Sequence, residues 1–276
     1  AWGWLATDAF VVGNVVQAGT TSLFQAALYK ASGLEEVKAE DKGSVTKAGF
    51  KVIYRGSGKE LYRLYCKIAD KARAGLGLVQ TLDDESKKTV EENLKRLEDA
   101  KNAVKELVDK LLIEGRITAH PAAGMSVGEA AERAKRAAEG ILSQEAAKKI
   151  DPVKHQAYGR VYYSLADLLL RDVSEAELAQ FFTAAIFGDG TITPYYVELT
   201  LGEFGSRSKK LPYDRFHKLA LWLAVIERYR PLFERYGVDI TPSVYVRENT
   251  IELRFDPKAA GLLFALGGGP VWRVYD

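Results

Sequence analysis

Cysteine, methionine and histidine are almost missing from this chain, which has one, one and three of them among its 276 residues. The single cysteine, Cys66, excludes a disulfide within the chain and a zinc site built from several thiolates. His120, His155 and His217 are too widely spaced for the paired histidines of a metal-ligand motif. No apolar run approaches the roughly 20 residues that a membrane-spanning helix needs. We therefore expect no membrane partner and no metal site made of cysteine or histidine.

Asparagine and glutamine are also scarce, whereas glutamate, lysine and arginine are abundant, a bias that is typical of hyperthermophile proteins. With 47% hydrophobic and 28% charged residues, the chain has the profile of a soluble globular protein, and it is long enough for two cores. The apolar stretch 2–16 has no basic leader and no cleavage pattern, so it does not indicate a signal peptide. These features favour a cytoplasmic protein of archaeal origin.

The formal net charge is +2, which by itself does not indicate a polyanionic partner. A near-neutral protein can still carry a basic face, and basic residues recur in two stretches with tyrosines between them. The candidates for nucleic-acid contacts are Lys47, Lys51, Arg55, Lys59, Arg63 and Lys67 in the first stretch, and Tyr195, Arg207, Lys209, Lys210, Arg215, Arg247 and Arg254 in the second. At each position, a solvated charge balanced by aspartate or glutamate is the alternative.

The most specific pattern lies at 181–199, where an apolar helix runs through Gly188-Asp189-Gly190 into an alternating strand. A capping box formed by Ser174 and Glu177 predicts where the helix begins. Alanine and glycine at 184, 185 and 188 keep the end of this helix narrow, so a second helix could pack closely beside Asp189. An ordinary turn between a helix and a strand is the alternative interpretation of Gly-Asp-Gly.

The segments that follow predict two strand pairs separated by a long helix. We expect a strand at 191–202, with a second strand at 203–210 that has only weak support from the sequence. A long amphipathic helix follows at 214–236, and Gly237 is its C-cap. A hairpin at 240–246 and 250–255 and a short helix at 257–266 complete the predicted unit.

This order, helix, two strands, helix, two strands and helix, over residues 174–266, with an acidic residue at the end of the first helix, resembles the repeat of LAGLIDADG homing endonucleases. In that family, two such helices pack together, and each delivers one acidic residue to a divalent-metal site over the DNA. The resemblance implies that Asp189 would be the catalytic metal ligand of this unit, with Mg²⁺ as the cofactor if the protein is an enzyme.

The N-terminal part looks like a degenerate copy of the same unit. Residues 2–12 would form the corresponding helix, because AFVVGN at 9–14 aligns with AAIFGD at 184–189. Asn14 then stands where Asp189 stands, and Asp8 lies nearly two turns away from that position. The remaining expected elements are a helix at 21–32, strands at 35–45 and 50–55, and a closing helix at 57–75.

Between the two units the sequence is helical. Residues 84–114 predict a long helix with an apolar seam, residues 126–140 predict an alanine-rich helix that folds back on it, and a third helix is expected at 153–171. The predicted fold class is α+β, with two LAGLIDADG-like αββαββα units at 1–80 and 151–276 separated by a helical hairpin spacer at 81–150. A plain bundle packed on one body is the alternative for the hairpin.

A neutral amide at position 14 would weaken a site for hard divalent ions. We therefore expect a nucleic-acid-binding protein without catalysis or cofactor, acting on structured RNA such as the ribosome. Archaeal ribosome hibernation factors, which inhibit translation, have a similar layout of two modules. The alternatives are a homing endonuclease or nickase that cuts DNA with Mg²⁺ through Asp189, and a protein-interaction scaffold organised around the helical hairpin. The oligomeric state stays open.

Overall fold

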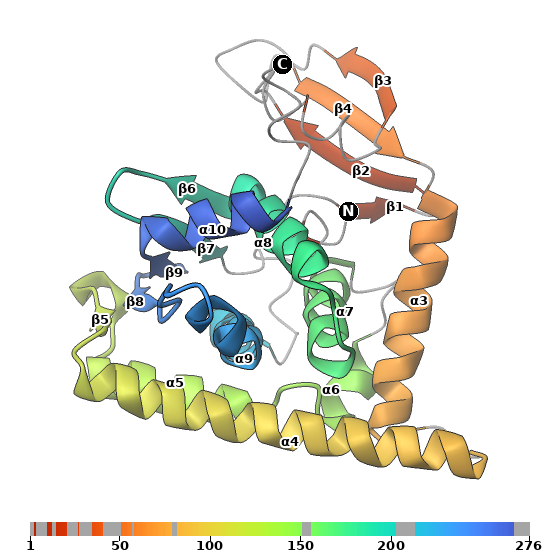
Figure 1. Cartoon of the computed structure of the whole chain (residues 1–276), viewed down its shortest axis with the longest axis horizontal. Helices are drawn as coiled ribbons and strands as arrows, with labels where there is room; N and C mark the ends of the chain where they lie inside the picture. The colour runs from red at the N-terminus through yellow and green to blue at the C-terminus, as the bar shows by residue number, and fades with distance from the viewer. Residues whose placement is uncertain are drawn as a thin grey trace.

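A four-stranded sheet and a five-stranded sheet flank a set of helices, with the longest helix running beneath them (Figure 1). A computed structural model describes residues 3, 10–12, 15–20, 27, 35–40, 51–56, 58–78, 82–150, 156–202 and 213–267. In the strands before residue 57 and in the helix up to residue 65, only the path of the backbone is described. The structure is α+β, as the sequence predicts.

The C-terminal unit follows the predicted order of elements. Its elements are α8 (Glu175–Asp189), β6 (Gly190–Ile192), β7 (Val197–Gly202), α9 (Arg215–Glu234), β8 (Ser243–Val246), β9 (Thr250–Phe255) and α10 (Pro257–Gly267). The capping box of Ser174 and Glu177 begins α8, and Gly237 follows α9 with a φ of 68°. The predicted start of α8 is confirmed, whereas α9 ends at Glu234 with Arg235 as its C-cap, two residues before the predicted Gly237.

The first strand pair of this unit differs from the prediction. Residues 191–202 were expected to form one strand, but β6 and β7 form an antiparallel hairpin with Thr191 opposite Glu198. The turn at 193–196 contains Pro194 and a threonine whose hydroxyl bonds to the backbone across the turn. The pair is therefore complete by residue 202, and the segment 203–210, where a second strand was considered, lies outside the described residues.

Alternation along these strands separates a core face from an outer face. The strand order is β5-β8-β9-β7-β6, and all neighbours except β5 and β8 are antiparallel. The apolar residues of the inner face are Val197, Leu199, Leu201, Val244, Val246, Ile251, Leu253 and Phe255, all of them buried. They pack against α8, α9 and α10, while the polar residues between them lie on the opposite face.

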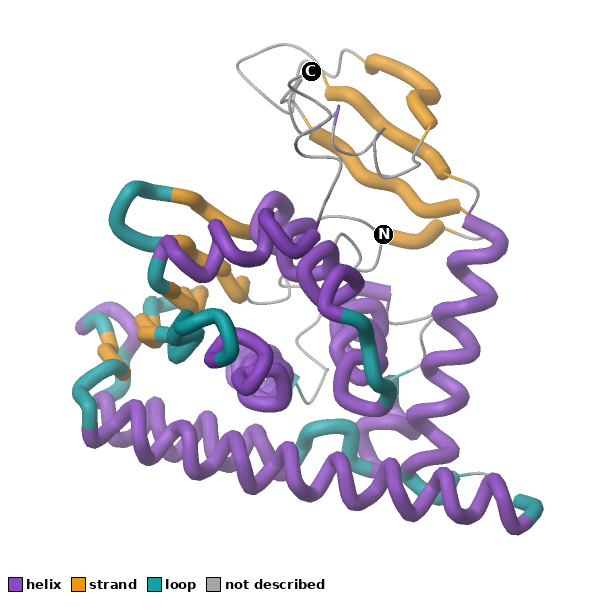
Figure 2. Tube along the Cα trace, viewed as in Figure 1, coloured by secondary structure: helices purple, strands orange, loops and turns teal. Residues whose placement is uncertain are grey.

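The N-terminal unit contains a second antiparallel sheet, seen at the top of Figure 2. Its elements are β1 (Phe10–Val12), β2 (Val15–Thr20), β3 (Glu35–Glu40), β4 (Lys51–Gly56) and α3 (Gly58–Gly75). The predicted strand pair and closing helix are confirmed over these ranges. The helix expected at 2–12 is wrong for its last turn, because Phe10–Val12 pair as a strand with Val15–Gln17.

The two sheets share one connectivity. The N-terminal sheet has the order β1-β2-β4-β3, and the four strands of the C-terminal unit have the order β6-β7-β9-β8. In chain order, both read first, second, fourth, third. Gly3 and Ala27 are helical, which places helical residues before β1 and between β2 and β3. The described strands and closing helix of the N-terminal part thus follow the same order as those of the C-terminal part.

The central segment forms a helical hairpin, as expected. It consists of α4 (Asp84–Ile113), β5 (Ile117–Ala119), a 3₁₀ turn (Pro121–Ala123), α5 (Val127–Glu139) and α6 (Gln144–Lys149), and α7 (Gln156–Leu170) follows. The capping box of Ser126 and Glu129 begins α5. The seam of α4 is buried at Leu97, Val104 and Leu107, whereas Leu94 is exposed.

The hairpin packs along the C-terminal unit instead of standing apart from it. Helices α4 and α5 both contact α9, and β5 pairs in parallel with β8, with Thr118 opposite Tyr245. Buried residues from α3 to α10 belong to one hydrophobic cluster. The expected spacer at 81–150 is therefore, over its described part, a layer of the same packed body.

Polar contacts fasten these helices to one another. The guanidinium of Arg228 in α9 donates to the carbonyls of Leu169 (2.8 Å) and Arg171 (3.1 Å) and to the carboxylate of Asp172 (2.9 Å). Arg96 of α4 donates to the carbonyl of Leu170 at 2.8 Å. Arginines from two helices thus satisfy carbonyl groups that the end of α7 leaves without helical partners.

A second polar joint connects α5 with α9. Asp214, the N-cap of α9, accepts from the Phe216 amide at 2.8 Å and from Arg133 of α5 at 2.7 Å. Burial opposes its ionisation, but hydrogen bonds and charges from His217, Phe216 and Arg133 outweigh this effect and lower the pKa of Asp214 to about 2. The carboxylate is therefore charged at neutral pH and holds the two helices together.

Across the described ranges, no helix is both long enough and apolar enough to cross a membrane.

Candidate nucleic-acid interface

The narrow end of α8 lies in close contact with the N-terminal segment. A Cβ atom added to Gly3 would lie 2.2 Å from the carbonyl oxygen of Phe181 and 2.6 Å from the Cβ of Ala184. Such distances are far below van der Waals contact, so only glycine fits at position 3. The sequence predicts that a second helix can approach α8 at its small residues, and a helical residue does so here.

The Gly-Asp-Gly sequence is a tight junction between α8 and β6. A Cβ atom at Gly190 would lie 2.3 Å from the carbonyl oxygen of Ile186 and 2.8 Å from that of Glu198. The φ of Gly190 is −105°, which any residue can adopt. Glycine is required at position 190 because of this close approach and not because of a left-handed turn. Asp189 is the last residue of α8, and it is exposed at this junction.

The outer face of the C-terminal sheet carries a connected group of polar and aromatic side chains. We call it the outer sheet face, and it consists of Tyr196, Glu198, Thr200, Tyr245, Arg247, Glu252 and Arg254. All seven are half-buried. They come from β7, from β8 and β9, and from the residues directly beside these strands, so the two hairpins of the unit bring them together.

Arg254 is at the centre of the outer sheet face. Its guanidinium carbon lies 4.3 Å from the ring centres of both Tyr196 and Tyr245, one on each neighbouring strand. Its Nε donates to Glu198 at 2.7 Å, and another nitrogen donates to Glu252 at 3.0 Å. Desolvation acts against its charge, but the carboxylate of Glu198 outweighs this effect, so the pKa of Arg254 is raised. A planar cation is thus held in one orientation between two rings.

Arg247 extends this network toward the β8–β9 turn. It donates to both carboxylate oxygens of Glu252, at 3.0 and 3.2 Å, and this carboxylate raises the pKa of Arg247. Two arginines are therefore balanced by two glutamates on this face. Such a charge-balanced face has little net charge with which to neutralise phosphates. Arginine, glutamate and tyrosine held in fixed geometry are suited to the hydrogen-bonding edges and flat faces of bases.

The other candidates of the C-terminal stretch have different placements. Arg215 is only 4% exposed, and its guanidinium donates to the carbonyls of Arg247 and Glu248. It therefore supports the β8–β9 turn from inside. Because its side chain is buried, it is not placed to contact a nucleic acid. Tyr195 is 84% exposed at the tip of the β6–β7 hairpin. An unbroken strand at 191–202 would put Tyr195 on the same side as Val197, but Tyr195 belongs to the turn.

The basic residues of the N-terminal stretch lie on different elements from the outer sheet face. Lys51 and Arg55 belong to β4, and Lys59, Arg63 and Lys67 belong to α3, where the side chain of Lys67 is exposed. Lys47, Arg207, Lys209 and Lys210 lie outside the described residues, as does Asn14. The structure therefore brings together Arg247 and Arg254. Tyr195 directly precedes Tyr196, a member of the outer sheet face, in the chain.

Four important members of the outer sheet face were not among the candidates from the sequence: Tyr196, Glu198, Tyr245 and Glu252. The alternation in 196–200 and 250–255 already placed some of them on one face. The candidates were chosen as basic residues with one tyrosine, so Glu198 and Glu252 were passed over because they carry the opposite charge, although they orient the arginines.

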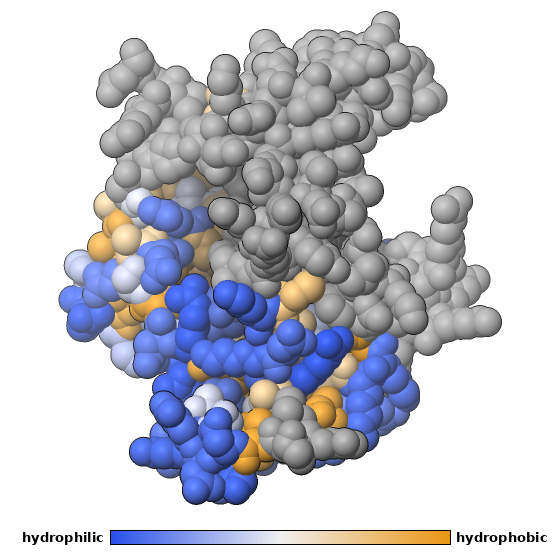
Figure 3. Space-filling model, turned by 90° about the vertical axis from the view of Figure 1, so that its right-hand side faces the viewer, coloured by the Kyte–Doolittle hydropathy of each residue, from blue (hydrophilic) through white to orange (hydrophobic). Residues whose placement is uncertain are grey.

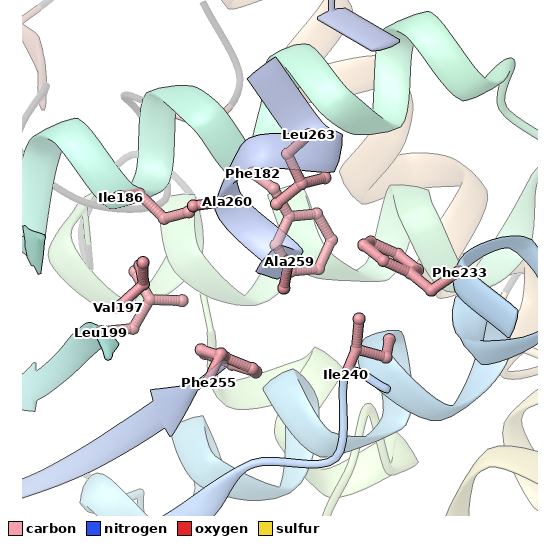
Figure 4. Close-up of a pocket in the computed structure, with 10 residues that line it drawn as sticks. All are labelled: Phe182, Ile186, Val197, Leu199, Phe233, Ile240, Phe255, Ala259, Ala260 and Leu263. Atoms are coloured by element: carbon pink, nitrogen blue, oxygen red, sulfur yellow. The ribbon is translucent and has the colours of Figure 1, made fainter. Parts of the chain in front are cut away.

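The cavity on the other side of this sheet does not offer a second site. It has a volume of about 20 Å³ and lies between α8, α9, α10 and the inner sheet face (Figure 4). Its lining is entirely apolar and includes Phe182, Leu199, Phe233 and Leu263. A dry space of this size is a packing imperfection of the core.

Metal ligands are not gathered anywhere within 82–150, 156–202, 213–267 or the shorter described ranges. No group of three or more histidine, cysteine, aspartate or glutamate side chains there could hold a metal ion. Asp189 is the single carboxylate that the described residues place at the end of α8.

The surface turned toward the viewer in Figure 3 is relevant to the alternative that the protein is a protein-interaction scaffold. Its described part is mostly hydrophilic, with hydrophobic areas between the polar ones. Exposed apolar residues of α4 are Leu94 at 42%, Leu112 at 38% and Ile113 at 86%. Leu94 lies several turns from the other two, so these residues do not form one broad docking surface on this helix.

No protein-family model matches the chain, and searches of curated proteins and of solved structures return no match. The function is therefore inferred from the residues themselves and from their placement.

Proposed function

We propose that this protein binds nucleic acid through the outer sheet face of a LAGLIDADG-like unit. The observation that carries the proposal is the fixed position of Arg254 between Tyr196 and Tyr245, with Glu198 and Glu252 completing its hydrogen bonds. The remaining guanidinium donors, the carboxylates and the tyrosine rings form a surface that can discriminate bases.

Two further observations support the scaffold. The strand order first, second, fourth, third occurs in both sheets, and each sheet is followed by a helix, α3 or α10. The N-terminal segment also approaches the end of α8 at a distance that only glycine permits. A repeated unit whose first helices meet at small residues is what the LAGLIDADG resemblance implies.

Structured RNA is the target class that we favour, and a ribosome-bound, hibernation-type role is one instance of it. In RNA, loops and bulges expose base edges and base faces that a regular duplex hides. A charge-balanced face with tyrosines gains more from such bases than from a row of phosphates. This role needs no metal ion.

Replacing Arg254 with methionine tests the proposal, because methionine keeps the length of the stem and removes every donor. We expect affinity for a fluorescent RNA stem-loop with a randomised loop to fall at least about tenfold, since one good contact to a base edge contributes about 1–3 kcal/mol. Fluorescence anisotropy at one fixed salt concentration measures the change. Arg235→Met is the matched control, because Arg235 is exposed and pairs with Glu175 away from the sheet. Equal affinities for wild type and both variants would exclude the outer sheet face as the RNA-binding site.

A second candidate function is metal-dependent cutting of DNA, and the contact at Gly3 favours it. Residues 10–12, which come just before position 14 in the sequence, form the strand β1 and not the end of a helix, so the alignment of Asn14 with Asp189 loses its support. Gly3 lies against Ala184, and Asp8 follows Gly3 by the same five residues that separate Ala184 from Asp189. Asp8 is therefore the better counterpart by sequence, although it lies outside the described residues.

The described residues alone do not make an Mg²⁺ site, because they supply one carboxylate at this place and hard divalent ions prefer several oxygen ligands. We therefore derive no catalytic step. The test is incubation of duplex DNA with wild-type protein and Mg²⁺, beside Asp189→Asn and Asp8→Asn. If the second candidate is right, wild type cuts or nicks, and each substitution abolishes cutting while binding persists. Cutting that survives both substitutions, or no cutting by wild type, contradicts it.

A further inference from the structure

The tip of the β6–β7 hairpin presents an aromatic ring to solvent. Tyr195 is 84% exposed, and Ile192, at the end of β6, is 47% exposed. No charged residue occurs in the sequence between Asp189 and Glu198. The tip is therefore uncharged and carries exposed apolar surface, which suits a flat neutral partner better than a phosphate or an acidic peptide.

The turn that carries this ring is held in one conformation. The hydroxyl of Thr193 accepts from the amides of Tyr195 at 3.2 Å and Tyr196 at 3.0 Å, and it donates to the carbonyl of Tyr196 at 2.9 Å. The Thr193 amide donates to the same carbonyl at 2.9 Å. A ring on such a turn loses little conformational freedom when it binds, because the backbone is already ordered.

The tip is continuous with the outer sheet face. Tyr196, the next residue, packs its ring on Arg254, and Arg254 packs on Tyr245 in turn. The planar groups of Tyr245, Arg254 and Tyr196 therefore follow one another across the sheet, and Tyr195 directly precedes Tyr196 in the chain. An exposed ring on the turn beside these groups makes a nucleobase the partner of matching shape and chemistry.

We propose that Tyr195 stacks on an unpaired nucleobase, which extends the proposed nucleic-acid function and rests on it. In a regular duplex, both faces of each base are covered by its neighbours, so a ring at a hairpin tip reaches a base face only in a loop, a bulge or a single strand. Stacking on an aromatic side chain tolerates any base, since every base has a flat face. Tyr195 thus contributes preference for unpaired nucleic acid, whereas the outer sheet face contributes base readout.

The experiment uses the full chain and two RNA probes with the same stem, one closed by an unpaired loop containing 2-aminopurine and one fully paired. Tyr195→Ala should weaken binding of the looped probe about tenfold and leave the paired probe unchanged. Tyr195→Phe should keep wild-type affinity, because the ring remains. Wild type and Tyr195→Phe should quench the 2-aminopurine fluorescence on binding, and Tyr195→Ala should not.

Tyr236→Ala is the matched control, because Tyr236 is 49% exposed and its hydroxyl bonds to Glu175, away from the sheet. Circular dichroism verifies that each variant is folded. If wild type binds neither probe, the proposed function fails together with the stacking. If wild type binds and Tyr195→Ala binds and quenches as well as wild type, or loses both probes equally, the stacking alone is wrong.

Discussion

Replacing Gly3 with alanine should lower the free energy of unfolding by about 3 kcal/mol, although alanine normally favours a helix. The new methyl group would lie 2.2 Å from the Phe181 oxygen and 2.6 Å from the Ala184 Cβ, so the N-terminal segment or α8 would have to move. The backbone of α8 cannot yield in the way that a flexible side chain does. Urea unfolding, followed by circular dichroism, measures the loss.

Gly128→Ala is the matched control for this experiment. Gly128 also lies in a helix, and a Cβ atom there meets no atom within 4 Å. The same chemical change should therefore raise stability by up to about 1 kcal/mol. If Gly3→Ala and Gly128→Ala had similar effects, Gly3 would not lie against α8, and the observation that supports pairing of the two units would be lost.

The second large effect is expected at Arg228, because its side chain connects α9 to the end of α7 and to Asp172 through three hydrogen bonds. Arg228→Met keeps the apolar stem and removes all three, which should lower the free energy of unfolding by about 2–3 kcal/mol. The carbonyls of Leu169 and Arg171 then lose their charged donor.

Arg235→Met again provides the comparison, since the ion pair of Arg235 with Glu175 is exposed and contributes at most about 1 kcal/mol. Parallel thermal unfolding of the two variants separates the cases. An Arg228→Met protein as stable as Arg235→Met would show that Arg96, which donates to the Leu170 carbonyl, suffices to satisfy the end of α7.

The helices and their ends could be predicted from the sequence because their signals are local. Ser174 with Glu177 and Ser126 with Glu129 form capping boxes where the sequence places them. The alternation at 250–255 predicts β9 in full. Each of these signals needs only a few neighbouring residues.

The sequence-based predictions were wrong where contacts between residues far apart in the sequence, or side-chain contacts within a turn, determine the structure. At residues 10–12, an apolar run reads equally well as helix or strand, and pairing with β2 makes it a strand. The helix end that the alignment of Asn14 with Asp189 requires is therefore absent at residues 10–12. At 190–202, the hydroxyl of Thr193 makes a turn that periodicity does not reveal. Arg215 looks like a surface cation in sequence, but the carbonyls of the β8–β9 turn bind it in the interior.

Because β5 pairs in parallel with β8, the helical hairpin supplies the edge strand of the C-terminal sheet. The Arg116 carbonyl accepts from the Val244 amide at 2.8 Å, and the His120 amide donates to the Val246 carbonyl at 2.8 Å. A fragment restricted to 151–276 would lack this strand, and the exposed edge of β8 would be open to strand exchange with another copy. The segment at 82–150 is therefore not a removable insertion, because without it the C-terminal sheet would lose its edge strand β5.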